Sequence, residues 1–326
     1  MRVLVTGGSR YIGLSLVRTL AEQGHDVTVF NSHEADLPTG VRRIHGDRRI
    51  PGVLHDTLAP YRDSFDAIFD NTAYVRSDLE PMLALFSGRV QHFVFTSSSA
   101  VYRRSLVHPV TESFSTHAPD DPTPAKSYGV GKVQCENFLL EQHRTNGFPA
   151  TVLRVGHTIG PRSPLATRDP IYFARLEAQR PILIPGDGFA FLHLIHIDDV
   201  ASLMASVLGN PKAAGQTYNV FGSEVASLLN CVRVMGRVVG VEPNIVHVPM
   251  SMAKSLHRPL VHWGEGIMGG AVFSTEKAQR ELGWRPKFGL ESGYRDSYEW
   301  FANGGRANYE FDFSFDDEVL AKLSIG

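Results

Sequence analysis

A glycine-rich turn near residue 10 constrains the fold more than any other feature of this sequence. Residues 6–13 read Thr-Gly-Gly-Ser-Arg-Tyr-Ile-Gly and stand between a short apolar run, Val3–Val5, and a helix-like pattern, Leu14–Gln23. Gly7 permits a tight turn, and Gly13 lets the helix pack closely against a strand. A helix that begins after such a turn directs its backbone N–H groups toward a phosphate. The turn therefore predicts a dinucleotide-binding site.

Short β-branched runs alternate with helical patterns over the first half of the chain. The predicted strands are Val3–Val5, Val27–Phe30, Ala67–Asp70, His92–Thr96 and Thr151–Val155. The predicted helices between them are Leu14–Gln23, Leu79–Phe86 and Tyr128–His143. Such alternation forms a parallel sheet with helices on both faces, which binds ligands at the carboxyl ends of its strands. We predict an α/β fold: a Rossmann doubly wound parallel sheet with a smaller α/β substrate-binding domain.

The regular alternation ends near residue 156, beyond which Pro and Gly are frequent. We predict an NAD(P)-binding Rossmann domain over residues 1–156, with 192–221 returning to it. The predicted substrate-binding domain covers 157–191 and 222–310, and 311–326 form a tail. The tail is acidic and aromatic, and we assign it no function.

The charge balance argues against a polyanionic partner. The chain has 32 Lys and Arg against 34 Asp and Glu, whereas nucleic-acid affinity needs a concentrated basic face. We expect the basic doublets at 42–43, 48–49 and 103–104 to be solvated surface pairs. Cys135 and Cys231 have neither disulfide-scaffold nor zinc-ligand spacing, and no apolar run is long enough to cross a bilayer. These features predict a cytoplasmic protein that binds a small molecule and neither membrane nor nucleic acid.

Two later segments provide further candidates for the cofactor pocket. Asp47 follows a predicted third strand. At that place its carboxylate would accept a hydrogen bond from an adenine amino group. Thr72 and Ala73 follow the fourth strand, where small residues would lie beneath the adenine ribose and the pyrophosphate. A loop aspartate and a helix cap are the alternative interpretations of these two segments.

Tyr128 and Lys132 form a candidate catalytic pair. They lie four residues apart on a predicted helix, so both side chains project from one face. A nearby ammonium stabilises a phenolate, which suits Tyr128 to act as a general acid or base. On its own, this spacing also fits a surface tyrosine beside a solvated lysine.

Together these motifs resemble the extended short-chain dehydrogenase/reductases, the NAD-dependent epimerase/dehydratase family. The resemblance covers nearly the whole chain and rests on residues 6–13, Thr96–Tyr102, Tyr128–Lys132, Leu153–Arg154, Gly160–Arg162, His196–Val200 and Lys277–Pro286. Among the family's branches, the arginine in the glycine turn and the loose second half look most like the chloroplast stem-loop-binding proteins and their bacterial relatives.

The resemblance implies a catalytic set of Ser98, Tyr128 and Lys132. Ser98 takes the place of the residue that hydrogen-bonds the reacting oxygen, and Ser97 and Ser99 are the less favoured choices. Tyr128 would exchange a proton with a substrate hydroxyl while the cofactor carries the hydride, and Lys132 would also hold the nicotinamide ribose. The implied activity is that of an NAD(P)-dependent oxidoreductase or epimerase acting on a hydroxyl or ketone of a sugar or sugar nucleotide. Relatives commonly form homodimers through the helix that carries Tyr128 and the preceding helix.

Two departures from the family pattern bear on the choice of cofactor. Arg10 replaces the middle glycine of the turn, and in shorter dehydrogenases an arginine there meets the 2′-phosphate of NADP. Asn31, followed by Ser32, replaces the acidic residue that holds the ribose 2′-hydroxyl of NAD, which removes a repulsion against that phosphate. We therefore predict that NADP is slightly preferred over NAD. The predicted cofactor-binding residues are Gly7, Arg10, Tyr11, Ile12, Gly13, Asn31, Ser32, Asp47, Thr72, Ala73, Tyr128 and Lys132.

The substrate side also departs from the family pattern. Related 4,6-dehydratases place Asp-Glu directly after the catalytic residue, where this chain has Ser99-Ala100; without those proton carriers a 4,6-dehydratase is disfavoured. His157 and Leu192 occupy positions where many relatives have an Asn and an Arg. The predicted substrate-binding residues are Tyr74, Ser98, Ser99, His157 and Arg162.

Two other functions remain open at this point. The missing substrate arginine suggests a reductase or isomerase of a non-nucleotide substrate, such as a secondary metabolite. The likeness to stem-loop-binding proteins suggests an RNA-binding or scaffold protein that retains the fold. We predict no metal site, because His193 and His196 would point to opposite faces of a strand.

Overall fold

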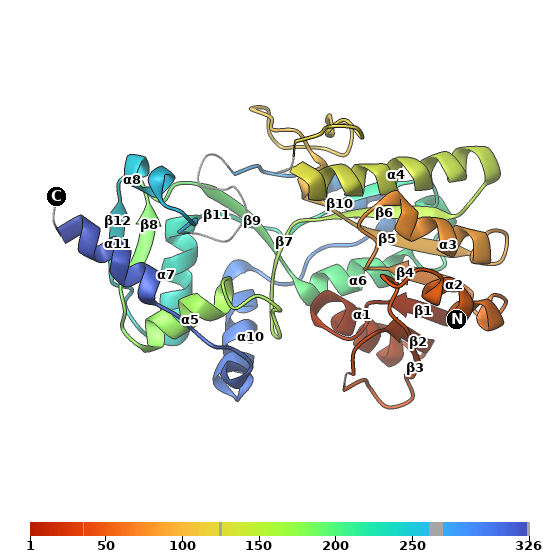
Figure 1. Ribbon diagram of the computed structural model, residues 1–326, viewed down its shortest axis with the longest axis horizontal. Coiled ribbons are helices and arrows are strands. Elements are labelled where there is room, and N and C mark those ends of the chain that lie inside the picture. The colour runs from red at the N-terminus through yellow and green to blue at the C-terminus, as the bar shows by residue number, and fades with distance from the viewer. Residues whose placement is uncertain (35, 124–125, 261–269, 325–326) are drawn as a thin grey trace. The chain divides into compact units, whose positions relative to one another are not determined.

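The computed structural model describes residues 1–34, 36–123, 126–260 and 270–324. The chain divides into two compact units, each built from separate stretches of sequence (Figure 1). The first unit comprises Met1–Gly156, Ile197–Phe221 and Phe273–Pro286. The second comprises His157–His196, Gly222–Val272 and Lys287–Gly326. Residues 261–269 of the predicted substrate-binding domain and residues 325–326 of the predicted tail lie outside the described residues.

The first unit is built on a seven-stranded parallel sheet with the order β10-β6-β5-β4-β1-β2-β3. Its strands are β1 (Arg2–Thr6), β2 (Asp26–Asn31), β3 (Arg42–His45), β4 (Ala67–Asp70), β5 (His92–Ser98), β6 (Ala150–Val155) and β10 (Thr217–Val220). Every residue of β4 and β6 is buried, as expected for central strands covered on both faces. This sheet confirms the predicted doubly wound α/β fold.

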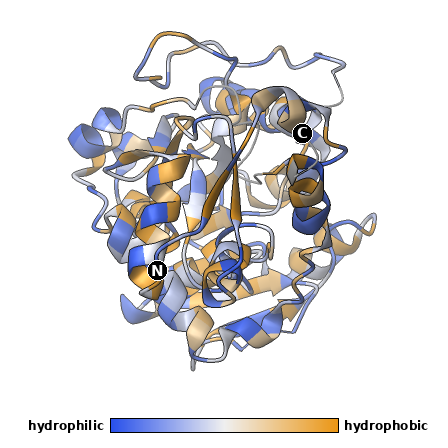
Figure 2. Ribbon diagram, turned by 90° about the vertical axis from the view of Figure 1, so that its left-hand side faces the viewer, coloured by the Kyte–Doolittle hydropathy of each residue, from blue (hydrophilic) through white to orange (hydrophobic). Residues whose placement is uncertain are grey.

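Helices cover both faces of this sheet. They are α1 (Tyr11–Glu22), α2 (Val53–Leu58), α3 (Arg76–Phe86), α4 (Ser127–Asn146), α6 (Ile197–Val207) and α9 (Glu276–Leu282), with short 3₁₀ turns η1 (Ala59–Tyr61), η2 (Ser99–Val101) and η4 (Pro211–Ala213). α1 packs against α6, where the Ser15 hydroxyl donates to Asp198, and α3 packs against α4 on the other face (Figure 1). In Figure 2 several helices carry apolar and polar residues side by side along their length, as expected for helices with one buried face.

The second unit is a smaller α/β assembly with its own core. Its strands are β7 (His157–Ile159), β8 (Ile182–Pro185), β9 (Phe191–His196), β11 (Val225–Ser227) and β12 (Ile245–Val248), arranged as one sheet of order β11-β9-β7 and one β12-β8 pair. Its helices are α5 (Asp169–Glu177), α7 (Leu228–Val239), α8 (Met250–Ser255), α10 (Leu290–Ala302) and α11 (Ser314–Ser324), with a 3₁₀ turn η6 (Gly305–Asn308). Tyr172, Phe173, Tyr294 and Phe301 are fully buried between them.

The two units differ from the predicted domain boundaries in three places. The return to the first unit starts at Ile197 and not at 192, because β9 pairs with β7 and β11 in the second unit. Phe273–Pro286 belong to the first unit, where Phe273 bridges to Val110. The tail forms α11, which packs on the second unit's core and is held by a buried ion pair.

Candidate active site

The glycine turn lies at the carboxyl end of β1, as predicted. Gly7 has a φ of +74°, which only glycine adopts freely. A Cβ at Gly7 would overlap the Thr72 methyl group, and a Cβ at Gly13 would overlap the Gly7 carbonyl oxygen. Arg10 is the N-cap residue of α1 and its side chain is exposed. The two glycines therefore allow the tight, closely packed turn that leads into α1.

Asn31 is a buried amide at the carboxyl end of β2. It is 7% exposed, and neither its Oδ1 nor its Nδ2 has a hydrogen-bond partner among the described residues. Buried polar groups are almost always hydrogen-bonded in a complete protein. A ligand hydroxyl or phosphate is therefore the kind of group that this position suits.

Asp47 lies just beyond β3, near Asn31. The backbone N–H of Gly46 donates to the Asn31 carbonyl at 3.0 Å, which joins the two strand ends. The Asp47 carboxylate accepts hydrogen bonds from the guanidinium and the backbone N–H of Arg49. These bonds lower the pKa of Asp47 to about 2, so the side chain is an anionic acceptor throughout the physiological range.

Arg48 is not a solvated surface residue, and the expectation from the doublet at 48–49 is wrong for it. Its side chain is 8% exposed, and its Nη1 lies 2.7 Å from Oδ1 of the fully buried Asp70. Asp70 also accepts hydrogen bonds at 3.0 Å from the Thr6 hydroxyl and from the backbone N–H groups of Thr72 and Ala73. Burial alone would raise the pKa of the Asp70 carboxyl, but the Arg48 charge and these bonds hold it below its ordinary value.

The sequence contains one signal that would have predicted this buried pair. Asp70 ends an apolar strand that is buried throughout, and a carboxylate there needs a cationic partner. The arginine that supplies the charge comes from a loop 22 residues away in sequence. Sequence spacing alone does not identify it.

Lys132 is buried in the first unit beneath two strand ends. Its Nζ donates to the carbonyl oxygens of Ala73, at 2.7 Å, and Thr96, at 2.8 Å. It also lies over the aromatic rings of Phe95, 4.7 Å from the ring centre, and Tyr74, at 5.0 Å. Burial lowers the pKa of Lys132 to about 8, so its ammonium is not a solvated surface charge.

Tyr128 and Tyr74 lie beside this lysine at the surface of the first unit. Their ring centres are 6.0 Å apart, and the Tyr128 ring centre is 5.9 Å from the Lys132 Nζ. Tyr128 is 47% exposed and Tyr74 is 56% exposed. The structure thus brings together three residues that the sequence analysis selected, with both phenol rings accessible.

The serine run lies at the end of β5, next to α4. The Ser97 hydroxyl donates to buried Glu136 at 2.5 Å, whereas the Ser98 oxygen accepts from the Ala100 N–H at 3.2 Å. A Cβ at Gly129 would overlap the Ala100 carbonyl oxygen, so glycine lets α4 approach this segment closely. Ser97 is therefore committed to the interior, and Ser98 and Ser99 remain the candidates for substrate contact.

A buried polar network that the sequence analysis missed supports the serine segment. Glu136 forms an ion pair with Arg154 at 2.7 Å, and Arg154 donates to the Tyr102 hydroxyl at 2.9 Å. The Tyr102 hydroxyl donates to Asn219 at 2.6 Å. Glu136 lies four residues after Lys132 and on the same side of α4, which is the one signal in the sequence that points to it.

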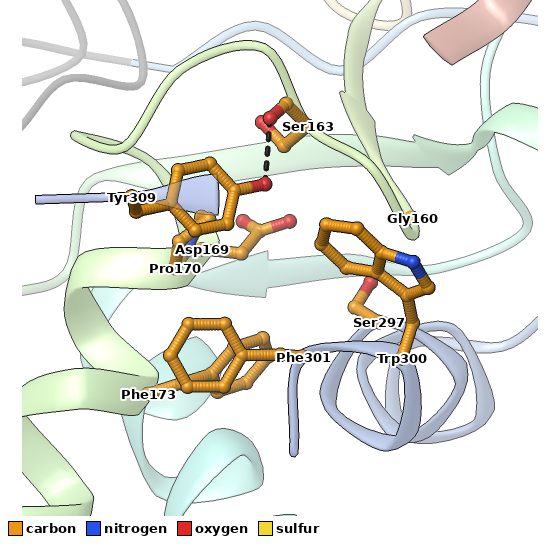
Figure 3. Close-up of a pocket in the computed structure, with 9 residues that line it drawn as sticks. All are labelled: Gly160, Ser163, Asp169, Pro170, Phe173, Ser297, Trp300, Phe301 and Tyr309. Atoms are coloured by element: carbon orange, nitrogen blue, oxygen red, sulfur yellow. Dashed lines mark hydrogen bonds between the residues drawn. The ribbon is translucent and has the colours of Figure 1, made fainter. Parts of the chain in front are cut away.

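The predicted substrate residues His157 and Arg162 belong to the second unit. Burial, with a smaller effect of the Arg168 charge, lowers the pKa of His157 to about 4, so the ring is neutral at physiological pH. Arg162 follows β7 in a left-handed conformation, with its guanidinium 5.8 Å from the centre of the Trp300 ring. Trp300 lines a small pocket with Asp169 and Tyr309, whose hydroxyl donates to the Ser163 carbonyl at 2.7 Å (Figure 3).

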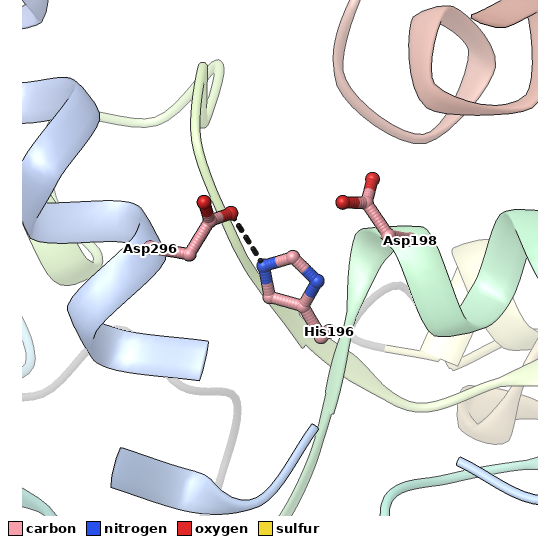
Figure 4. Close-up of side chains that lie close together, drawn as sticks. All are labelled: His196, Asp198 and Asp296. Atoms are coloured by element: carbon pink, nitrogen blue, oxygen red, sulfur yellow. Dashed lines mark ion pairs between the residues drawn. The ribbon is translucent and has the colours of Figure 1, made fainter. Parts of the chain in front are cut away.

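The two histidines of β9 have separate partners. His193 contacts the carbonyl oxygen of Gly222 through its Nε2 at 2.9 Å. The Nε2 of His196 lies 3.1 Å from the carboxylate of Asp296 on α10 (Figure 4), and its ring stacks on Phe288. Both contacts hold β9 within the second unit.

Residues 3–220 match the NAD dependent epimerase/dehydratase family. The match covers more than half of the chain, and the protein belongs to this family. The resemblance inferred from the motifs is therefore confirmed. None of the helices that the structure describes is long and apolar enough to cross a membrane.

Individual relatives agree with this assignment. The chain is 28% identical over 341 residues to the chloroplast stem-loop binding protein of 41 kDa b of Arabidopsis thaliana, covering 99% of this chain and 85% of that protein. It is 25% identical to the UDP-glucose 4-epimerase GEPI48 of Cyamopsis tetragonoloba, covering 91% and 94%. A dTDP-glucose 4,6-dehydratase structure from Streptomyces venezuelae, with NAD bound, has a TM-score of 0.77 at 22% identity, covering 95% and 99%. The last similarity concerns the fold.

Proposed function

We propose that the protein is an NAD(P)-dependent oxidoreductase or epimerase that acts on a hydroxyl or ketone of a sugar nucleotide. The observation that carries the proposal is the cluster of Tyr74, Tyr128 and Lys132 at the carboxyl edge of a sheet whose first strand ends in a glycine-rich turn. Membership of a family that includes a UDP-glucose 4-epimerase supports the substrate class.

The residues of the carboxyl edge fit a nicotinamide dinucleotide. Gly7 and Gly13 let the turn pack closely against Thr72 and against its own backbone, and Arg10 is exposed at the start of α1, where a pyrophosphate would bind. Asn31 offers an uncharged donor and acceptor where a carboxylate would repel a 2′-phosphate. We propose that NADP and NAD both bind, with NADP slightly preferred, and that Asp47 accepts the adenine amino group.

The dinucleotide, when bound, supplies hydride acceptance and donation. Tyr128 moves the proton of the substrate hydroxyl, for which its accessible phenol is suited. Ser98 hydrogen-bonds the same substrate oxygen from the end of β5. Lys132, held by two carbonyl oxygens, places a positive charge beside the Tyr128 ring, which favours the phenolate form.

We propose that Tyr74, Ser98 and Ser99 of the first unit contact the substrate. His157 and Arg162 of the second unit stay predicted substrate-binding residues. Because burial keeps His157 neutral, Arg162 is the one of the two whose charge suits a phosphate. The homodimer and the cytoplasmic location stay predictions.

The test combines cofactor identification with product analysis. Mass spectrometry of the purified protein would identify any co-purified dinucleotide, and incubation with a panel of sugar nucleotides followed by NMR would identify the product. We expect an epimer or a redox product, and no 4-keto-6-deoxy sugar, because Ser99-Ala100 replaces the Asp-Glu of the dehydratases. A 4-keto-6-deoxy product would contradict the choice of reaction. Absence of any dinucleotide binding would contradict the proposal as a whole.

A further inference from the structure

We propose that the buried Arg48–Asp70 ion pair is a positioning pair that sets the shape of the cofactor-binding edge and joins its adenine end to Lys132. The inference rests on the proposed function, since it concerns the same cofactor. It assigns Arg48 and Asp70 a role that the glycine turn and the Ser98, Tyr128 and Lys132 set do not include.

The pair connects three strand ends. Arg48 comes from the loop after β3 that carries Asp47, and Asp70 is the last residue of β4. One oxygen of Asp70, Oδ1, lies 2.7 Å from Arg48 and accepts from the hydroxyl of Thr6, the last residue of β1. Arg48 also donates to the Thr72 hydroxyl at 2.7 Å. The loops after β1, β3 and β4 are therefore held by one buried contact.

The same contact extends to the candidate catalytic lysine. Asp70 accepts the backbone N–H of Ala73, and Lys132 donates to the carbonyl oxygen of Ala73 at 2.7 Å. A change at the Arg48–Asp70 pair therefore moves a residue that bonds Lys132 directly. The Thr72 methyl group, positioned by the same carboxylate, also packs against the Gly7 turn.

The pair also resolves an electrostatic conflict at this edge. A lone carboxylate below a pyrophosphate site would repel the phosphates, and its burial would favour the protonated acid. Arg48 supplies the compensating charge at 8% exposure, so Asp70 can remain an acceptor for two backbone N–H groups. Without Arg48, Asp70 would hold the loop after β4 less firmly and would reduce the attraction of this edge for a phosphate.

The experiment measures dinucleotide affinity separately from folding. The variants Arg48→Met, Asp70→Asn and Arg48→Lys would be compared with the full-length wild type by fluorescence titration with NADH and NADPH and by urea unfolding. Arg2→Met is the control for the loss of an arginine–aspartate pair elsewhere in the sheet, because Arg2 pairs with Asp66 at the same 2.7 Å but at the amino ends of β1 and β4 and with greater exposure.

We expect the dissociation constants of Arg48→Met and Asp70→Asn to rise at least about tenfold, because small displacements of positioning groups have large effects. Arg48→Lys keeps the charge but not the planar guanidinium, whose Nη1 reaches both Asp70 and Thr72, so its dissociation constant should fall between those of the wild type and Arg48→Met. Arg2→Met should bind both dinucleotides like the wild type.

Three results would count against the inference or against the proposed function. Folded Arg48→Met and Asp70→Asn proteins that bind NADH and NADPH like the wild type would overturn the inference and leave the pair a structural ion pair. If these two variants do not fold, wild-type affinity in Arg48→Lys would overturn it. A wild-type protein that binds neither dinucleotide would contradict the proposed function instead.

Discussion

The ammonium of Lys132 illustrates how single residues define this site. It is 3% exposed, yet it retains two carbonyl acceptors and two aromatic faces. These contacts compensate only part of the loss of hydration, which is why burial lowers the pKa of Lys132 to about 8. Lys132 therefore keeps a cationic group in the interior, close to the Tyr128 ring.

This burial predicts a specific pH dependence of stability. The pKa of Lys132 is about 8 in the folded protein against 10.5 for an ordinary lysine, so between these values the unfolded chain binds more protons. Raising the pH through this window therefore stabilises the wild type relative to Lys132→Met, by about 3 kcal/mol in total. Below pH 8 the difference between the free energies of unfolding of the two proteins should stay constant. Urea unfolding of both proteins from pH 7 to 10.5 measures it, and a difference that does not vary with pH would contradict the assignment.

In the proposed function, the preference between NADP and NAD depends on Asn31. The Asn31→Asp variant introduces a carboxylate that accepts the ribose 2′-hydroxyl of NADH and repels the 2′-phosphate of NADPH. The ratio of the NADPH to the NADH dissociation constant should rise by about tenfold or more. Fluorescence titration measures both constants. Asn137→Asp, on the exposed face of α4, is the control for the added charge, and an unchanged ratio in Asn31→Asp would show that Asn31 does not contact the ribose.

At the scale of elements, α4 connects the parts of the site. It carries Tyr128 and Lys132, and its glycines at 129 and 131 allow the helix to approach the backbone of Ala100 and of Tyr74. These glycines lower the intrinsic helix propensity. Because they have no side chain, they let α4 lie close to the loops that follow β4 and β5.

The Gly129→Ala variant tests this role of α4. In an unconstrained helix, replacing glycine by alanine would stabilise the protein by about 1 kcal/mol. In α4 the new methyl group would collide with the Ala100 carbonyl oxygen. We expect lower stability and a lower kcat, because Tyr128 and the Ser98 segment move apart. Thermal unfolding and steady-state kinetics provide the two measurements, with Asn137→Ala on the exposed face as the control. A more stable and equally active Gly129→Ala protein would refute the close approach.

The elements themselves could be predicted largely from the sequence. The apolar runs at 67–70 and 92–96 coincide with β4 and most of β5, and the helix predicted over 128–143 lies within α4, because local periodicity reports burial directly. The partners of buried charges could not be predicted in this way. Arg48 and Arg154 pair with residues that only the tertiary fold brings to them, and a doublet such as Arg48-Arg49 does not show which member is buried.

At the scale of the whole molecule, the chain passes between the two units several times. The frequency of Pro and Gly shows where the regular alternation of strands and helices ends. It does not show to which unit β9 belongs, which depends on the pairing of β9 with β7. The catalytic candidates lie in the first unit, while α11 and the aromatic segment before it complete the core of the second. Stability of the second unit and dinucleotide binding by the first are therefore expected to be separable.

Asp316→Ala tests this separation. Asp316 forms a bidentate pair with Arg175 in which both side chains are less than 10% exposed, so its removal leaves a buried guanidinium without its carboxylate. We expect the free energy of unfolding to fall by about 3 kcal/mol, with an unchanged NADH dissociation constant. Asp317→Ala, which removes the neighbouring and more exposed pair with Arg180, should alter stability little. A large loss of NADH affinity in Asp316→Ala would show that the units do not act separately.

The proposed function depends on proton transfer by Tyr128 in a dinucleotide-dependent reaction on a sugar nucleotide. The most direct measurement compares wild type and Tyr128→Phe for the rate of sugar-nucleotide turnover and, on the same samples, for the NADH dissociation constant. We expect a rate lower by about a hundredfold or more, with an NADH dissociation constant close to that of the wild type. A Tyr128→Phe protein that turns over the sugar nucleotide at the wild-type rate would contradict it.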